Sequence, residues 1–292
     1  MTNDVSTLTT AITNYTQSLN GRNISPHTIT AYQTDLAQFA AWITDSDISV
    51  TQPAHVTRYH VTEYLSHLSG KGLTGTTRAR KLASIREFFK YLVDNDSIPA
   101  SPAASISMPR KEKKSRVFLR PDEYSRLLSA AGSSPRDFCI LQLFLQTGMR
   151  VSELVSLTID DLDLTSRTIT IHGKGKKERV IDLEKKAIQA LKNYRKFRPQ
   201  VLDPHLFLNY EGQGISDRGV KKLIEKYRQL AGIEKKFSTH SLRHTFATYK
   251  AEKGVSPFQL QQWLGHTSVT TSQIYVHMGR EYAKRAMEQT SL

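Results

Sequence analysis

The sequence predicts a mainly α-helical protein of two domains, with a small β-sheet in the C-terminal domain. Three observations carry this prediction. The length of 292 residues exceeds the usual size of one domain. Apolar residues recur at helical spacing in both halves of the chain. Only residues 167–182 alternate apolar and polar side chains in the manner of paired strands.

The N-terminal domain, residues 1–100, is predicted to be a bundle of four helices. Ser25 followed by Pro26 is typical of a helix start, with serine as the N-cap and proline in the first turn. In the last helix, Leu82, Ile85 and Phe89 form an apolar stripe. The predicted helices cover residues 5–19, 26–43, 56–68 and 76–93.

Basic residues on the last of these helices are predicted to lie away from its apolar stripe. Such a face fits a DNA groove, and it also fits an ordinary solvent-exposed surface. The chain holds 41 Lys and Arg against 27 Asp and Glu, and its net charge of +14 favours binding to a polyanion. The candidate DNA contacts here are Arg78, Arg80, Lys81 and Arg86.

Residues 101–116 are predicted to link this domain to a C-terminal domain of residues 117–292. Pro102 and Pro109 disfavour a helix. The charged run Arg-Lys-Glu-Lys-Lys-Ser-Arg at 110–116 resists packing. A solvated hinge and a DNA-contacting linker would share this composition. The candidate DNA contacts in the linker are Lys111, Lys113 and Lys114.

The C-terminal domain is predicted to be helical around one β-hairpin. Gly148 ends a helix, since glycine commonly follows a helix C-terminus. Predicted strands at 167–171 and 178–182 flank a glycine- and lysine-rich turn, which is typical of a hairpin. Lys174 of this turn is a candidate to give a proton to a leaving oxygen, and Lys176 and Lys177 are candidate DNA contacts. Solvated lysines in a charged turn would have the same sequence. The predicted helices are 121–131, 136–146, 151–157, 184–197, 216–230, 240–253, 257–264, 270–276 and 279–289.

Polar side chains gather at the start of one predicted helix. His240, Arg243 and His244 share a helix face, and the N–H groups and dipole of a helix N-terminus favour an anion there. Two histidines four residues apart also suit zinc, but Ser241 stands where the HExxH zinc motif has glutamate. We therefore expect neither a metal nor another cofactor.

Two further groups complete a candidate phosphate site. Arg150 follows the glycine-ended helix, and Glu153 can orient its guanidinium, although a purely structural pair would look the same. Tyr275 follows His266 by nine residues. A phenol of pKa near 10 needs cationic neighbours to act as a nucleophile. Together these residues predict phosphoryl transfer on a nucleic acid by a tyrosine nucleophile.

At these residues the chain resembles the tyrosine recombinases, or λ-integrase family, and especially its Xer-like branch. The resembling motifs are TGMRVSEL at 147–154, GKGKKER at 173–179, HSLRH at 240–244, LGH at 264–266 and IYVH at 274–277. Residues 24–32 and the helix at 82–95 are similar to the core-binding domain of the family. The resemblance implies a SAM-like core-binding bundle and a tyrosine-recombinase catalytic fold that form a C-shaped clamp on DNA.

The resemblance also implies a reaction. Tyr275 would attack the scissile phosphate and form a 3′-phosphotyrosyl bond. Arg150 and Arg243 would bind the non-bridging oxygens, and Lys174 would protonate the leaving 5′ oxygen. His240 would assist proton transfer with Tyr275.

The remaining implied roles concern support and partners. His266 would hydrogen-bond the phosphate, and Glu153 would support the site. The implied partner is double-stranded DNA with a specific core site, held by a homotetramer on two such sites, with a related recombinase or accessory proteins as further partners. A cytoplasmic location and no membrane association are expected, since the N-terminus has no basic region of a signal peptide.

Two other functions fit the sequence. One is a DNA-binding architectural or regulatory protein with this fold and little cleavage activity. The other is a relaxing enzyme similar to type IB topoisomerases, which uses similar groups. Covalent capture of DNA separates the first from a recombinase, and relaxation of any supercoiled plasmid would identify the second.

Overall fold

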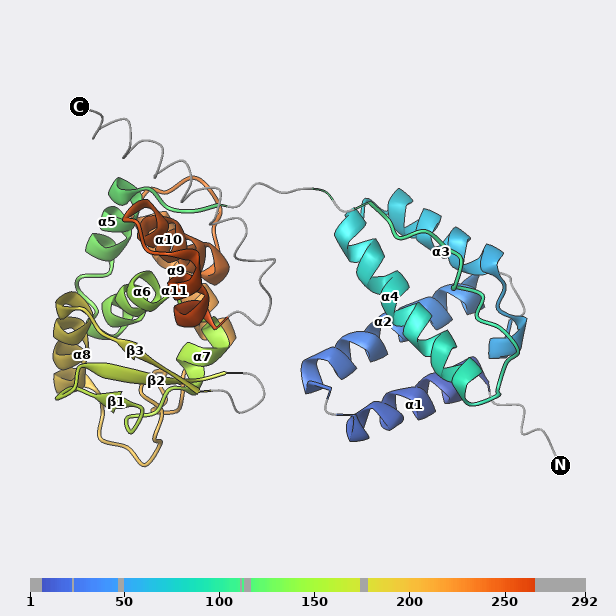
Figure 1. The fold of residues 1–292 in the computed structure, drawn as a ribbon, viewed down its shortest axis with the longest axis horizontal. Helices are drawn as coiled ribbons and strands as arrows, with labels where there is room; N and C mark the ends of the chain where they lie inside the picture. The colour runs from blue at the N-terminus through green and yellow to red at the C-terminus, as the bar shows by residue number, and fades with distance from the viewer. Residues whose placement is uncertain are drawn as a thin grey trace. The chain divides into compact units, whose positions relative to one another are not determined.

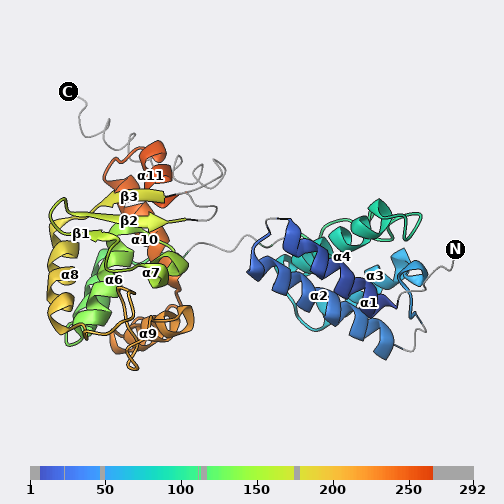
Figure 2. The same cartoon turned by 90° about the horizontal axis from the view of Figure 1, so that it is seen from below.

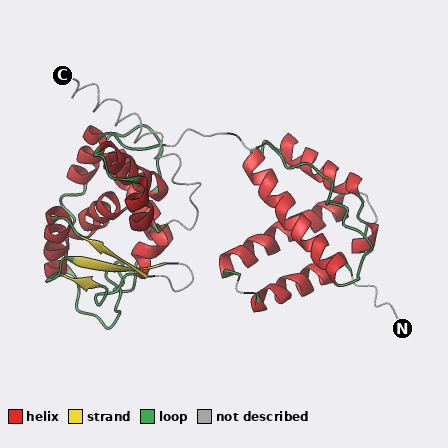
Figure 3. Cartoon of the chain, in the orientation of Figure 1, coloured by secondary structure: helices red, strands yellow, loops and turns green. Residues whose placement is uncertain are grey.

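A computed structural model describes residues 7–22, 24–46, 50–110, 112, 117–173 and 178–265. The chain divides into two compact units, residues 1–114 and 115–292 (Figure 1). Each unit has its own hydrophobic core. Helices predominate, and the described strands all belong to one small sheet (Figure 3). None of the described helices combines the length and the apolar character that crossing a membrane requires.

The first unit contains the four predicted helices. Phe39, Tyr64 and Phe89 are among the side chains buried where these helices meet. Ser25 is the N-cap of the second helix, as predicted, and its hydroxyl accepts the backbone N–H of Thr28 at 3.3 Å. The helices are α1 (Leu8–Ser18), α2 (Pro26–Asp45), α3 (Arg58–Gly70) and α4 (Gly75–Asp94), with short 3₁₀ turns η1 (Leu19–Gly21) and η2 (Pro53–His55).

Two basic residues of α4 do not lie on an open face. Lys81 is buried, and its Nζ donates to Asp35 Oδ1 of α2 at 3.0 Å. The expectation that it lies away from the apolar side is wrong, because α2 brings a buried carboxylate to that side. Arg86 donates from Nε to the carbonyl of Ala103 at 3.1 Å. Arg78 is half-buried and Arg80 is exposed.

The segment predicted as a linker begins against the first unit. Ala103 and Ile106 are buried in its core, and Arg86 donates to both carbonyl oxygens. The first unit therefore includes at least residues 103–106 of the predicted linker. Lys111, Lys113 and Lys114 lie outside the described residues.

The second unit is built around helix α6, which packs against α8 and α10. The seven helices described there are α5 (Pro121–Ala130), α6 (Pro135–Thr147), α7 (Val151–Ser156), α8 (Lys185–Phe197), α9 (Asp217–Leu230), α10 (Thr239–Glu252) and α11 (Pro257–Leu264). The prediction of these helices is confirmed to within two residues at each end. The two predicted after residue 264, at 270–276 and 279–289, lie outside the described residues.

The sheet is antiparallel, in the order β1-β2-β3. Its strands are β1 (Leu162–Asp163), β2 (Thr168–His172) and β3 (Glu178–Asp182). The predicted hairpin of β2 and β3 is confirmed, and its last described rung pairs His172 with Glu178. β1 was not predicted, since two residues are too few to show alternation. Helix α11 packs beside β3, and α7 beside β2 (Figure 2).

Gly148 brings three helices together at the end of α6. Its φ of +61° is in the left-handed region, which favours glycine. A Cβ there would lie 2.4 Å from Phe246 Cδ1 of α10 and 2.8 Å from Leu264 Cδ2 of α11. The predicted helix end is confirmed, and it places Arg150 beside both α10 and α11. Cys139 of α6 is a core residue, as predicted, and burial raises the pKa of its thiol.

Candidate active site

Arg150 and Glu153 form an ion pair at the start of α7. Arg150 is the N-cap residue, and Glu153 is in the first turn. Glu153 Oε2 accepts the backbone N–H of Arg150 at 2.7 Å, and Oε1 accepts from Arg150 Nη1 at 2.8 Å. The carboxylate thus caps the N-terminus of α7 and also orients the Arg150 guanidinium. The Arg150 side chain keeps 36% of its surface exposed, so it can still meet a ligand.

A second guanidinium, from Arg179 of β3, holds the same carboxylate. Its Nη1 and Nη2 donate to the two oxygens of Glu153 at 3.0 and 2.8 Å. Burial of Glu153 on its own raises the carboxyl pKa. The hydrogen bonds from Arg179 and from the backbone of Arg150 outweigh that effect, and the pKa of Glu153 is lowered. Glu153 is therefore an ionised, buried carboxylate.

Arg243 of α10 is buried beside this pair. Its Nη1 donates to the carbonyl oxygen of Gly148 at 2.8 Å, and its Nη2 donates to that of Leu264 at 2.5 Å. These contacts tie α10 to the end of α6 and to the end of α11. They place the guanidinium beside the segment that carries Arg150.

The C-terminus of α11 is where these arginines meet. Three successive carbonyl oxygens accept from three guanidiniums: Trp263 from Arg179 at 2.8 Å, Leu264 from Arg243 at 2.5 Å and Gly265 from Arg150 at 3.2 Å. The last carbonyls of a helix have no partner within the helix, and the helix dipole places partial negative charge there. This helix end therefore attracts and orders three cations.

His240, the second residue of α10, stands within electrostatic reach of the arginines. The ring is on the surface, but protein packed around it desolvates the imidazole and lowers its pKa. The charges of Arg243, Arg150 and Lys221 lower the pKa further. His240 is therefore neutral at neutral pH and can accept a proton.

The structure thus brings together four of the predicted site residues, Arg150, Glu153, His240 and Arg243. The others lie outside the described residues: Lys174, Lys176, Lys177, His266 and Tyr275. The last described rung of the hairpin before residues 174–177 pairs His172 with Glu178. At this rung His172 Nδ1 and Glu178 Oε1 are 3.1 Å apart. His172 Nε2 also lies 2.7 Å from Asp161 Oδ1.

Arg179 is the site residue that the sequence reasoning missed. A signal was available, since residues two apart on a strand share a face. Arg179 shares its face of β3 with Ile181, which is buried. An arginine on the core-facing side of a strand requires a buried partner, and the sequence does not say which carboxylate that is.

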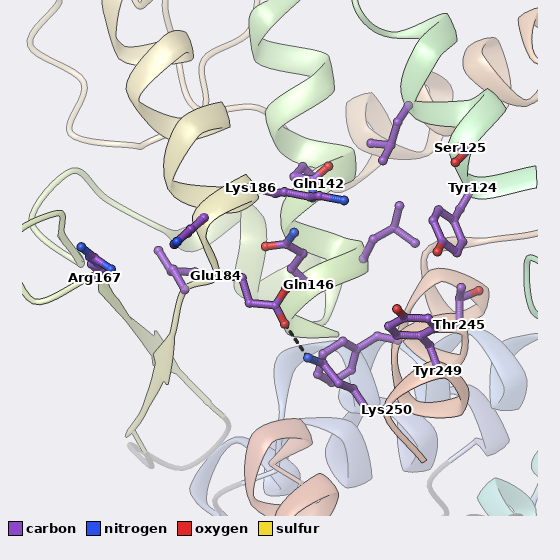
Figure 4. A pocket seen from close by; sticks show the side chains of 15 residues that line it. Tyr124, Ser125, Gln142, Gln146, Arg167, Glu184, Lys186, Thr245, Tyr249 and Lys250 are labelled. Carbon is purple, nitrogen blue, oxygen red and sulfur yellow. Dashed lines mark hydrogen bonds and ion pairs between the residues drawn. The ribbon is translucent and has the colours of Figure 1, made fainter. Parts of the chain in front are cut away.

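Among the described residues, no group of three or more His, Cys, Asp or Glu side chains is arranged to hold a metal ion. A cavity described in the second unit is also separate from the arginines. A cavity of about 630 Å³ opens between α5, α6 and α10, where Lys250 Nζ contacts Glu184 Oε1 at 2.5 Å (Figure 4). Arg150, Arg179 and Arg243 do not line it.

Comparison with known proteins gives a consistent result over most of the chain. Residues 117–281 match the model of the phage integrase family, and residues 12–96 match that of the phage integrase N-terminal SAM-like domain. The chain is 38% identical to tyrosine recombinase XerC of Thermodesulfovibrio yellowstonii, over 87% of this chain and 86% of that protein. It is 34% identical to tyrosine recombinase XerD of Listeria innocua, over 92% and 93%.

A solved structure is similar as well. The XerH site-specific recombinase, bound to a palindromic difH substrate in a post-cleavage complex, superimposes with a TM-score of 0.74. The match covers 93% of this chain and 81% of that chain, at 25% identity.

Proposed function

The chain belongs to the phage integrase family of tyrosine recombinases, and we propose that it breaks and rejoins DNA at specific sites with Tyr275 as its nucleophile. The proteins named XerC and XerD, to which it is similar over most of its length, support site-specific recombination. The net charge of +14 supports DNA as the substrate.

One observation carries the assignment of the site. Arg150 and Arg243 come from different helices, yet they donate to adjacent carbonyl oxygens, those of Gly265 and Leu264. The positive charges of both arginines help to lower the pKa of His240, which keeps its imidazole neutral. Two guanidiniums beside a proton acceptor form a site for a phosphodiester anion that is attacked by a hydroxyl group.

In the proposed reaction, the phenolic oxygen of Tyr275 attacks the scissile phosphorus. Its proton passes to His240. Arg150 and Arg243 stabilise the charge on the non-bridging oxygens as the P–O5′ bond breaks, and His266 donates to the same phosphate. Lys174 gives a proton to the departing 5′ oxygen.

Rejoining reverses these steps with a 5′-hydroxyl from another strand. One P–O bond forms for each that breaks, so the phosphotyrosyl ester conserves the bond energy. The reaction requires neither ATP nor a metal ion.

The finer proposals concern assembly and DNA contact. We place four protomers on two core sites, with strand exchange through a Holliday junction, and a related recombinase or accessory proteins as further partners. Arg78, Arg80, Lys176 and Lys177 are proposed DNA contacts, with the linker lysines. In a cell without a nucleus the substrate lies in the cytoplasm.

Covalent capture tests the proposal. A duplex with a nick close to the cleavage position loses a short strand after attack, so the protein–DNA adduct cannot religate. We expect the wild-type protein to form an adduct in the presence of EDTA, and Tyr275→Phe to bind the same duplex without forming one. Tyr249→Phe is the matched control, since Tyr249 lies on α10 in the lining of the separate cavity. An adduct formed by Tyr275→Phe would assign the attack to another residue.

A further inference from the structure

Arg179 makes three hydrogen bonds to other parts of the protein. Its Nε donates to the carbonyl oxygen of Trp263 at 2.8 Å, and its Nη1 and Nη2 donate to Glu153 at 3.0 and 2.8 Å. Three of the five guanidinium N–H groups are thus used, and only 14% of the side chain is exposed. These contacts fix the Arg179 guanidinium against Glu153 and the end of α11.

Arg150 differs from Arg179 in being open to solvent, although both hold Glu153. Each carboxylate oxygen of Glu153 accepts two hydrogen bonds, one from each arginine. Oε1 accepts from Arg150 Nη1 and Arg179 Nη1, and Oε2 accepts from Arg150 N and Arg179 Nη2. The two-pronged contact of Arg179 fixes the plane of the carboxylate. A carboxylate fixed in this way sets the direction of the Arg150 guanidinium.

The backbone around Arg179 is shaped to admit its guanidinium. Gly265 has a φ of +60°, and a Cβ there would lie 3.0 Å from Arg179 Nη1. The end of α11 thus passes directly against the guanidinium, and Trp263 supplies its carbonyl to it. Arg179 joins β3, α7 and α11 at one point.

Glu153 could not hold Arg150 as firmly without this second cation. A buried carboxylate is costly unless it is fully paired, and Arg150 alone is a partly exposed partner. Loss of Arg179 would leave both oxygens with unfilled positions, so that water or a rotated Arg150 could satisfy them. The expected consequence is a misdirected guanidinium rather than an unfolded domain.

We propose that Arg179 is a positioning residue of the cleavage site, which orients Arg150 toward the scissile phosphate by fixing Glu153 against the end of α11. The inference rests on the proposed function, since it takes Arg150 as a ligand of that phosphate. It adds a residue of β3 to the groups on which the cleavage rate depends.

The test compares Arg179→Lys with a matched control, Arg228→Lys. Arg228 also grips one carboxylate with two nitrogens, at 2.9 and 2.7 Å to Glu225, and donates to the carbonyl of Ile233 at 2.6 Å. Its side chain is 12% exposed, and it lies on α9. Lysine keeps the charge at both positions but cannot make the two-pronged contact.

We expect Arg179→Lys to lower the single-turnover rate of adduct formation by about 10- to 100-fold, as is common for residues that orient a ligand. DNA affinity should stay within about twofold, since one charge among many is conserved. Arg228→Lys should leave the rate unchanged. In an Arg150→Ala background, Arg179→Lys should have little further effect on the rate, because the two residues act through one contact.

A wild-type rate in Arg179→Lys, an equal loss in the Arg150→Ala background, or a parallel loss in Arg228→Lys would each overturn the inference. A second measurement does not depend on cleavage. Relaxation of the Arg150 Nε–H signal in NMR should show an ordered guanidinium in the wild type and a mobile one in Arg179→Lys. If the wild type formed no adduct, the proposed function would fail, while an unchanged Arg150 signal would reject the role of Arg179.

Discussion

Each of the two units contains a buried carboxylate that is neutralised by two cations, one enclosed and one open to solvent. The residues are Asp35, Lys81 and Arg80 in the first unit, and Glu153, Arg179 and Arg150 in the second. In both, the enclosed cation joins elements that are distant in sequence. In both, the open cation remains available to a polyanion.

The two groups differ in the enclosed cation. Lys81 is a point charge, which satisfies Asp35 Oδ1 at 3.0 Å without fixing the plane of the carboxylate. Arg179 grips both oxygens of Glu153 and fixes that plane. The first unit thus compensates charge between α2 and α4, whereas the second also sets direction. Stabilising a transition state requires a catalytic group in a defined orientation, whereas non-specific contact with DNA phosphates requires only positive charge.

Removal of the Asp35 charge should give the largest of the expected effects, a loss of stability of the first unit. Asp35→Asn leaves the ammonium of Lys81 buried without a counterion, and we expect a loss of about 3–5 kcal/mol in the stability of the first unit. Urea unfolding measures this, because Trp42 is in the first unit and the other tryptophan, Trp263, can be replaced by phenylalanine. The double variant Asp35→Asn, Lys81→Met should recover most of the loss. Equal stability of Asp35→Asn and wild type would show that water reaches Lys81.

Much of this fold was open to prediction, because its elements are set by local signals. Serine followed by proline began α2, and a glycine ended α6, since caps and dihedral angles depend on few neighbours. The hairpin followed from alternation around a glycine- and lysine-rich turn.

The charged interior was less open to prediction. Lys81 was expected on an exposed face because its partner Asp35 stands 46 residues away. Arg179 was missed because Glu153 lies 26 residues before it. Motif order marked Arg150 and Arg243 as a pair, but only the fold shows that the end of α11 collects them.

Exchange of arginine for lysine at the two open positions sharpens the comparison. Arg150→Lys should lower the rate of DNA cleavage by about 10²- to 10³-fold, the loss typical for one donor that stabilises a developing anion. Arg80→Lys should change neither this rate nor DNA affinity by more than about twofold. Single-turnover adduct formation and equilibrium binding measure the two effects. A wild-type cleavage rate in Arg150→Lys would mean that a positive charge at this position is enough, and that the orientation of the guanidinium does not matter in either unit.

Acidity should slow cleavage through His240, which lies within electrostatic reach of Arg150. The pKa of His240 is lowered from 6.5, so the imidazole is neutral above that pH and becomes protonated only at a lower pH. The acid side of the pH profile of the cleavage rate at limiting DNA should therefore have its midpoint below pH 6.5, and the rate should fall below that midpoint by up to about tenfold per pH unit. His240→Gln should be slower and should lack this fall. A midpoint at or above pH 6.5 would contradict the lowered pKa of His240.

The smallest expected effect concerns the open cation of the first unit. Arg80→Ala removes one exposed positive charge and leaves Lys81 to neutralise Asp35. If Arg80 contacts a DNA phosphate, the slope of log affinity against log salt should decrease in magnitude by about 1. The cleavage rate at saturating DNA should not change, because a contact made equally in the ground and transition states affects binding alone. A slower rate at saturation would instead give Arg80 a part in orienting the DNA, and the two carboxylate groups would then be alike in function as well as in composition.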